Sequence, residues 1–375
     1  MAITSERPGH ARVAGRDPEQ QVRFCRGGDG VRLAWAVHGS GPPLIVVSCW
    51  LSHLQHDWRS PVWRHFLEDI GAFATMVRYD ERGFGMSDWD VTDFSLEARF
   101  ADLETLVAAT GFDRFAVLGI SGGSAVALAY AARHPERVTR LILNGTVCGR
   151  PPTFDGEHLA EEETYRSMIR VGWAKEDPLF RRVFTRIYIP GATEEQMQWF
   201  DALQRSSTSP ENAVASRIAR HAVDIVDEIP RISAPTLILQ SVGDRATTFD
   251  NAVDVAGLIP DARLVELQSE NHILLAEDPA WPVALHEIQA FLEPDRAAWS
   301  ATTVGLAIHE ALSARELDVL RAAARGLDNE SIAVELGLSP RTVERHLSNA
   351  YGKLGLSGRS ARAAAVAEVL RRGLA

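Results

Sequence analysis

The first two thirds of the chain alternate between short apolar runs and longer segments in which apolar residues recur every three or four positions. Runs of four to six mostly apolar residues are typical of strands buried on both faces of a sheet. The longer segments indicate amphipathic helices, and one of them begins behind Ser95 and ends at Gly111. Such alternation predicts a parallel sheet covered by helices on both faces. The expected buried strands are Leu44–Val47, Ala74–Tyr79, Phe115–Leu118, Thr139–Leu143, Thr236–Gln240 and Ala262–Leu267.

Two segments depart from this alternation. An antiparallel pair opens the sheet, because Gln21–Arg26 and Val31–His38 flank an Asp-Gly turn, which is a hairpin signal. Between about residues 146 and 232 the strands stop, and helical segments rich in aromatic residues follow, which is typical of a lid. We therefore expect an α/β sheet domain with a helical cap.

A second domain is predicted near the C-terminus. Residues 294–311 mix Ala, Ser and Thr without a clear period and are interpreted as a linker. From Leu312 onward, helices are expected behind Ser313 and Ser339, with a further helix at Asn329–Leu336 between them. The predicted organisation is a lead-in at 1–20, the sheet domain at 21–293, the linker at 294–311 and an all-α domain at 312–375.

Composition agrees with two folded units, since 46% of the 375 residues are hydrophobic. The three cysteines are widely spaced and form no C-x-x-C pair, which argues against a disulfide framework or a zinc site. Residues 1–20 are polar, so we expect a disordered lead-in rather than a signal peptide, and no apolar run reaches membrane-spanning length. The sequence predicts a cytoplasmic protein with no membrane partner.

The charge is unevenly distributed along the chain. The formal net charge is −11, but the segment from Leu312 onward holds ten Lys and Arg against seven Asp and Glu. The acidic excess therefore belongs to the sheet domain. A basic segment on an acidic protein hints at contact with nucleic acid at that end.

Ser121 is the candidate nucleophile. It lies between the expected strand at Phe115–Leu118 and an alanine-rich helix, and Gly119 and Gly123 flank it at two residues' distance in a G-x-S-x-G pattern. Small residues permit the sharp turn that exposes such a serine hydroxyl, and the backbone N–H of Gly122 would face a developing oxyanion. A serine also needs a base and an acid nearby, and Asp244 and His272 each follow a late strand.

Residues 34–281 resemble the α/β-hydrolase family. The resemblance rests on the turn at Ser121, on a D-x-R-G-x-G-x-S loop at residues 80–87, and on Asp244 and His272 beyond their strands. It implies a Ser121–His272–Asp244 triad in the order that this fold uses. The sequence departs from the family at Thr248, where a proline is usual.

The resemblance also implies where an oxyanion and a ligand would bind. Ser48 and Cys49 replace the usual His-Gly, so the second oxyanion donor after Gly122 would be the backbone N–H of Trp50. We expect no cofactor and no metal, because the histidines His53 and His56 lack further ligands nearby. The predicted ligand pocket is lined by Trp50, Ile120, Trp173 and Trp199.

The C-terminal segment is predicted to form a helix-turn-helix. The helix from Pro340 carries an apolar face formed by Val343, Leu347, Ala350 and Leu354, which predicts a recognition helix with its polar face toward a major groove. Residues 312–355 resemble the LuxR-type DNA-binding domain in their L-S-A-R-E start, their turn and their K-L end, although Glu344 replaces a frequent lysine. By this resemblance, Arg359–Arg372 would form a dimerisation helix. The candidate DNA contacts are Arg341, Thr342, Arg345, His346, Asn349 and Lys353.

The two resemblances together predict a transcriptional regulator that binds DNA, as a homodimer on paired half-sites, and whose hydrolase-like domain senses a small molecule. The aromatic lid favours an apolar ester or lactone as the ligand. The sequence leaves three versions open. In the first, Ser121 hydrolyses the ligand, and in the second, the triad only holds it. In the third, the chain is an ordinary serine esterase whose DNA-binding tail has a secondary role.

Overall fold

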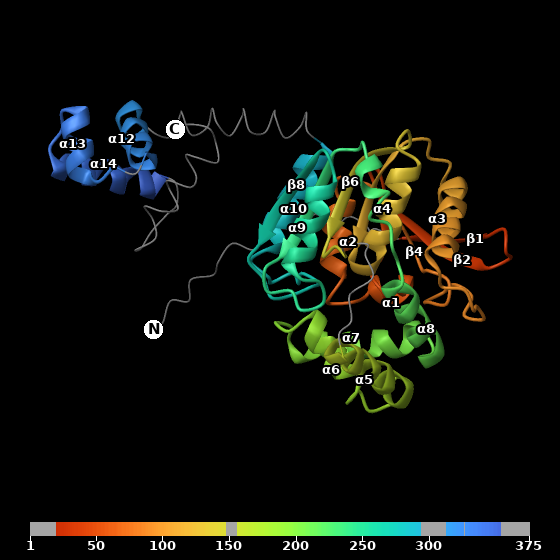
Figure 1. Ribbon diagram of the computed structural model, residues 1–375. Helices are drawn as coiled ribbons and strands as arrows, with labels where there is room; N and C mark the ends of the chain where they lie inside the picture. Colours follow the sequence, from red (N-terminus) through yellow and green to blue (C-terminus); the bar gives the residue numbers. More distant parts are fainter. Residues whose placement is uncertain (1–19, 148–155, 294–312, 326, 354–375) are drawn as a thin grey trace, which may run out of the picture. The chain divides into compact units, whose positions relative to one another are not determined.

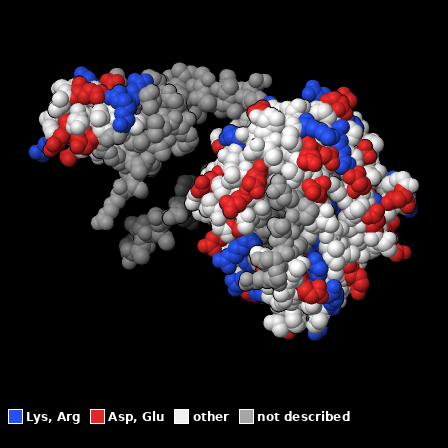
Figure 2. All heavy atoms as spheres, in the orientation of Figure 1, with Lys and Arg blue, Asp and Glu red and all other residues white. Residues whose placement is uncertain are grey.

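The computed structural model describes residues 20–147, 156–293, 313–325 and 327–353. The predicted lead-in except Gln20, the linker and the helix at Arg359–Arg372 lie outside these ranges. The chain divides into two compact units, Met1–Leu292 and Glu293–Ala375, and each is described by itself. Acidic and basic side chains are interspersed on the visible faces of both units (Figure 2), so neither visible face carries a single sign of charge.

The first unit is built on one eight-stranded sheet with the order β1-β2-β4-β3-β5-β6-β7-β8 (Figure 1). β2 pairs antiparallel with both β1 and β4, and all the other pairs are parallel. This confirms the predicted mixed sheet that begins with an antiparallel hairpin. The strands are β1 (Gln21–Arg26), β2 (Arg32–Gly39), β3 (Pro43–Val47), β4 (Thr75–Tyr79), β5 (Phe115–Ile120), β6 (Val138–Asn144), β7 (Thr236–Ser241) and β8 (Ala262–Leu267).

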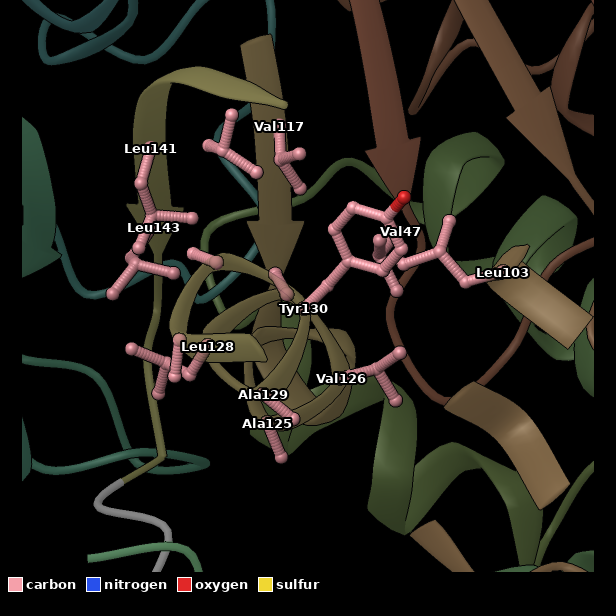
Figure 3. Packing of buried hydrophobic residues seen from close by; sticks show 14 of the residues in the cluster. Val47, Leu103, Val117, Ala125, Val126, Leu128, Ala129, Tyr130, Leu141 and Leu143 are labelled. Atoms are coloured by element: carbon pink, nitrogen blue, oxygen red, sulfur yellow. The ribbon is translucent and has the colours of Figure 1, made fainter. Parts of the chain in front are cut away.

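Helices cover both faces of the sheet. On one face, α3 (Leu96–Thr110), α4 (Ser124–Arg133) and α9 (Phe249–Leu258) pack on alternate strand residues in one buried cluster. Figure 3 shows α4 placing Val126, Leu128 and Tyr130 toward the strands and α3. On the other face, α2 (Arg64–Gly71) and α10 (Trp281–Leu292) pack on the opposite set of strand side chains. Side chains from both faces of each central strand are therefore buried, as the continuous apolar runs predict.

A helical lid follows β6. It consists of α5 (Gly156–Gly172), α6 (Arg181–Tyr188), α7 (Glu194–Ser207) and α8 (Pro210–His221). These helices lie together beyond one end of the sheet (Figure 1), and a small helix, α1 (Leu54–Asp57), follows β3. The lid has a separate apolar cluster, which includes Trp173 and Phe184 and reaches Trp50 in the loop after β3.

The second unit contains three described helices, α12 (Ala314–Ala324), α13 (Asn329–Leu336) and α14 (Pro340–Lys353). Ser313 and Glu316 form a capping box at the start of α12. Gly337 ends α13 with a φ of 62°, a conformation that glycine adopts without strain. Val343 and Leu347 of α14 pack against the other two helices in a small core, as predicted. None of the helices in the described ranges is long and apolar enough to span a membrane.

Candidate active site and nucleic-acid interface

Ser121 lies on a sharp turn between β5 and α4. Its φ is 52°, and it is the only non-glycine residue within the described ranges with a positive φ. A Cβ atom at Gly119 would lie 2.7 Å from that of Ala127, and one at Gly123 would lie 2.3 Å from the carbonyl oxygen of Ser48. Both positions therefore require glycine. The strained backbone of Ser121 is held by close packing on both sides, which is typical of functional turns.

Asp244 and His272 lie together beyond the carboxyl ends of β7 and β8. The Nδ1 atom of His272 is 2.7 Å from Oδ2 of Asp244, and both side chains are almost fully buried. The other oxygen of Asp244 accepts hydrogen bonds from the backbone N–H groups of Ala246 and Thr247 at 2.8 and 3.1 Å. Burial alone would raise the pKa of Asp244, but His272 and these hydrogen bonds outweigh it and lower that pKa. The carboxylate is therefore ionised at neutral pH and orients the imidazole.

The second nitrogen of His272, Nε2, forms no hydrogen bond to Ser121 in this structure. Because Nδ1 faces the Asp244 carboxylate and donates to it, Nε2 of the neutral ring is an acceptor. Nε2 is buried and has no hydrogen-bond partner in the described part of the chain. Gly145 leaves room for the ring, since a Cβ there would lie 2.7 Å from Cε1 of His272. An imidazole in this state has the properties of a general base.

A partly open cavity of about 130 Å³ adjoins the serine. Ser121, Gly122 and Trp50 line it, together with Tyr188 of the lid and Thr247 beside Asp244. The structure thus brings both expected oxyanion residues to the same cavity as the candidate nucleophile.

The other expected pocket residues lie elsewhere. Trp173 is 1% exposed in the core of the lid, where its indole donates to the carbonyl of Thr208 at 3.2 Å and packs against Trp50. Trp199 contacts His56 with the two rings tilted by 56° and their centroids 4.7 Å apart. Ile120 points into the cluster on the other face of the sheet. Aromatic content predicts a packed lid, but it does not tell which rings face the cavity.

The cavity is also lined by three arginines that the sequence does not mark as site residues. They are Arg99 of α3, and Arg217 and Arg220 of α8. Arg217 pairs with Glu162 of α5, and Arg220 pairs with Glu81. One signal was available for Arg99, which falls at helical spacing between Leu96 and Leu103 and so lies within the buried stripe of its helix. No comparable pattern marks the two arginines of the lid.

The loop after β3 is held by local contacts. Burial raises the pKa of the Cys49 thiol to about 12, and its Sγ donates to the carbonyl of Leu51 at 3.2 Å, so this thiol stays neutral. Nδ1 of His53 accepts from the backbone of His56, and Nε2 of His56 is 3.2 Å from the carbonyl oxygen of Trp199. Within the described ranges, no group of three or more His, Cys, Asp or Glu side chains is arranged to hold a metal ion.

The candidate DNA contacts divide into three groups on α14. Arg341, Arg345 and Asn349 are exposed, as a recognition face requires. Thr342 and His346 are half-buried, and the Thr342 hydroxyl lies 2.8 Å from that of Ser339 at the helix start. Lys353 is exposed, but its Nζ donates to Glu316 of α12 at 2.7 Å. That lysine therefore has a structural partner within the unit, and Leu354 lies outside the described residues.

The mixed sheet, the helical lid and the serine on a strand-to-helix turn define the α/β-hydrolase class of fold. Residues 42–175 match the family model for the alpha/beta hydrolase fold, and residues 310–366 match that for bacterial regulatory proteins of the luxR family. The chain therefore joins an α/β-hydrolase domain to a C-terminal DNA-binding domain of the luxR family, which confirms both predicted resemblances.

Individual relatives match the hydrolase part. The chain is 26% identical to the AB hydrolase superfamily protein YisY of Bacillus subtilis, over 62% of this chain and 86% of that protein. It is 24% identical to pyrrolizixenacetamide deacetylase of Xenorhabdus hominickii, over 66% of this chain and 90% of the relative. The esterase EaEST of Exiguobacterium antarcticum superposes with a TM-score of 0.61 at 21% identity, over 72% of this chain and 98% of the esterase.

Proposed function

We propose that the protein is a cytoplasmic transcriptional regulator whose hydrolase domain binds and hydrolyses a small ester or lactone, and whose luxR-family domain binds DNA as a homodimer. The observation that carries this proposal is the fusion itself, in which a DNA-binding domain shares a chain with a buried Asp–His pair and a strained serine turn. In such a chain, we expect ligand binding in the cavity to regulate DNA binding.

The chemistry follows from the side chains around the cavity. Ser121 attacks the ester carbonyl while Nε2 of His272 takes its proton, and Asp244 stabilises the imidazolium that forms. The backbone N–H groups of Trp50 and Gly122 are the proposed donors to the oxyanion. The alcohol leaves with the proton from His272. A water molecule then cleaves the acyl-enzyme by the same base catalysis, which releases the acid and restores Ser121.

The test is a comparison of serine variants of the full chain on p-nitrophenyl acetate and butyrate. Ser121→Ala is expected to lower turnover at least a thousandfold, because the acyl-enzyme cannot form. Ser206→Ala is the matched control, since Ser206 is exposed on α7 and donates to the backbone carbonyl of Ala202. Equal turnover by all three chains would refute hydrolysis by Ser121.

The same experiment separates the alternatives. A relative that deacetylates its substrate and a structural neighbour that is an esterase favour turnover. Cys49, where relatives of this fold usually have glycine, favours a receptor that holds its ligand without cleaving it. A chain that turns over esters but protects no DNA in a footprint of its own upstream region would instead be an esterase with a secondary tail.

A further inference from the structure

The cavity beside Ser121 is polar on one side. Arg99, Arg217 and Arg220 line it, and the acidic partners of this group are Glu81 and Glu162. Three guanidinium groups at the cavity thus share two direct carboxylate partners. A buried polar group without a hydrogen-bond partner is costly, so guanidinium N–H groups left unpaired at a cavity are candidates to bind a ligand.

Arg99 is the least satisfied of the three arginines. It reaches the cavity from α3, beneath the lid, and is 1% exposed. Its Nε donates to the carbonyl of Phe94 at 3.2 Å, whereas Nη1 and Nη2 have no acceptor in the described structure. Burial and the neighbouring charge of Arg220 lower the pKa of Arg99 to about 10, which still leaves the guanidinium charged at neutral pH.

Arg220 is close to both Arg99 and the serine turn. Its Nη2 donates to Glu81, but its Nε and Nη1 are buried without an acceptor among the described residues. A Cβ atom on Gly122 would lie 2.7 Å from Nη1 of Arg220, so this guanidinium adjoins the residue that follows the candidate nucleophile. Four buried N–H-bearing nitrogens without an acceptor thus belong to two arginines that line the cavity.

We infer that the cavity binds a ligand with a carboxylate group a few atoms from the acyl carbon that Ser121 attacks, and that Arg99 and Arg220 hold this carboxylate. The inference rests on the proposed function and narrows its ligand class to anionic esters or lactones. It replaces the apolar ligand that the aromatic lid alone favours.

The size of the cavity and its unpaired guanidinium groups favour a small carboxylate ligand. A volume of about 130 Å³ is close to that of a cavity that holds one benzene ring, roughly 150 Å³. The planar fork of a guanidinium matches the two oxygens of a carboxylate. The unpaired Nη1 and Nη2 of Arg99 and the unpaired Nε and Nη1 of Arg220 are enough donors for the two oxygens of one carboxylate. Half-esters of short dicarboxylic acids have this combination of size and charge.

The test compares two substrates of equal shape on the full chain. Methyl hydrogen succinate carries a carboxylate where methyl succinamate carries an uncharged amide, and hydrolysis of either ester releases methanol and one proton, which a pH-stat records. The unmodified chain is expected to prefer the acid by tenfold to a hundredfold in kcat/KM, because a buried charge pair replaces an uncharged hydrogen bond.

Two variants of Arg99 test whether this residue causes the preference for the acid. Arg99→Met is expected to lower the ratio of the two kcat/KM values at least tenfold, and Arg99→Lys, which keeps the charge but not the fork, should lie between the two. Arg263→Met is the control, because Arg263 pairs with Glu287 at the surface, 51% exposed. Thermal unfolding of each variant shows whether it is folded. A ratio that stays unchanged in folded Arg99→Met would overturn the assignment of Arg99.

The outcomes separate this inference from the proposed function. If turnover depends on Ser121 but methyl succinamate is hydrolysed as well as or better than methyl hydrogen succinate, the inferred carboxylate site is refuted. The proposed hydrolysis by Ser121 is then still supported. If neither ester is turned over, calorimetry with methyl hydrogen succinate decides: binding that weakens at least tenfold in Arg99→Met upholds the carboxylate site while hydrolysis fails. Absence of both turnover and methyl hydrogen succinate binding refutes both.

Discussion

At the residue scale, the Asp244–His272 pair gives the sharpest prediction. In the Asp244→Asn variant the amide cannot replace the carboxylate that orients Nδ1 and stabilises the imidazolium, so kcat for p-nitrophenyl acetate should fall by about a thousandfold to ten-thousandfold. Asp250→Asn is the control, because Asp250 is exposed on α9. The measurement is the initial rate across the pH range. An Asp244→Asn chain as active as the control would exclude the pair from catalysis.

The same pair shows what the sequence can reveal about a site. Ser121 is more than a hundred residues from both Asp244 and His272, yet each of the three lies in a local motif at the end of a strand, and the fold brings those ends together. Arg99 has no motif. It is a charged residue in the buried stripe of a helix, and only the structure shows that it lines a cavity with two residues of α8 and that two of its nitrogens lack an acceptor.

At the element scale, an ion cluster joins two lid helices. Glu162 of α5 accepts from Arg217, and lies 3.3 Å from Nδ1 of His221, both on α8. Burial alone would raise the pKa of Glu162, but the hydrogen bonds of His221 and Arg217 lower it to about 2. A carboxylate whose pKa is lower in the folded state adds stability above its unfolded pKa of about 4.5, and this stability is lost as pH falls toward about 2.

Glu162→Gln should therefore destabilise the lid by about 3 kcal/mol at neutral pH, and the difference from the unmodified chain should shrink below about pH 4.5. Urea unfolding at pH 7, 5 and 4 measures this. Glu163→Gln serves as the control, since Glu163 is 57% exposed and pairs with Arg170 at the surface. A gap of constant size from pH 7 to pH 4 would show that the cluster does not titrate in this way.

The exposed face of α14 carries the next prediction. Replacing Arg341 and Arg345 by alanine should weaken binding to a DNA fragment from upstream of the gene by at least tenfold, and if both contact phosphates the slope of log Kd against log salt should fall by about two. Arg315→Ala is the control, because Arg315 is 57% exposed on α12 near Asp318. Fluorescence anisotropy at several salt concentrations measures both quantities. A Kd and a slope equal to those of the control would show that this face of α14 does not contact DNA.

The elements themselves were predictable to different degrees. All eight strands and the three helices of the small unit follow from apolar period and capping residues, and Asn329–Leu336 agrees at both ends. For the lid, the sequence predicts only a helical region and not the bounds of its helices. Its helices bury aromatic side chains against each other rather than on the sheet, so Trp173 and Trp199 carry no sign of which surface they face.

At the scale of the whole molecule, two domains with separate cores share one chain, and a regulator needs a free-energy link between them. A ligand changes DNA affinity only if it binds the DNA-competent state more tightly or more weakly than the other state. The link is reciprocal, because the factor by which ligand changes DNA affinity equals the factor by which DNA changes ligand affinity. This equality is a property of binding and needs no knowledge of how the domains are arranged.

The last prediction uses Ser121→Ala, which cannot consume its ligand. Saturating methyl hydrogen succinate should change the Kd for the upstream DNA fragment by about fivefold to a hundredfold, the range of ordinary allosteric coupling. Saturating DNA should change the Kd for methyl hydrogen succinate, measured by calorimetry, by the same factor. In Ser121→Ala combined with Arg99→Met, the effect should disappear, because the carboxylate has lost its partner. If the ligand binds yet the Kd for DNA stays the same, the hydrolase domain is not the sensor, because a ligand of equal affinity for both states shifts neither.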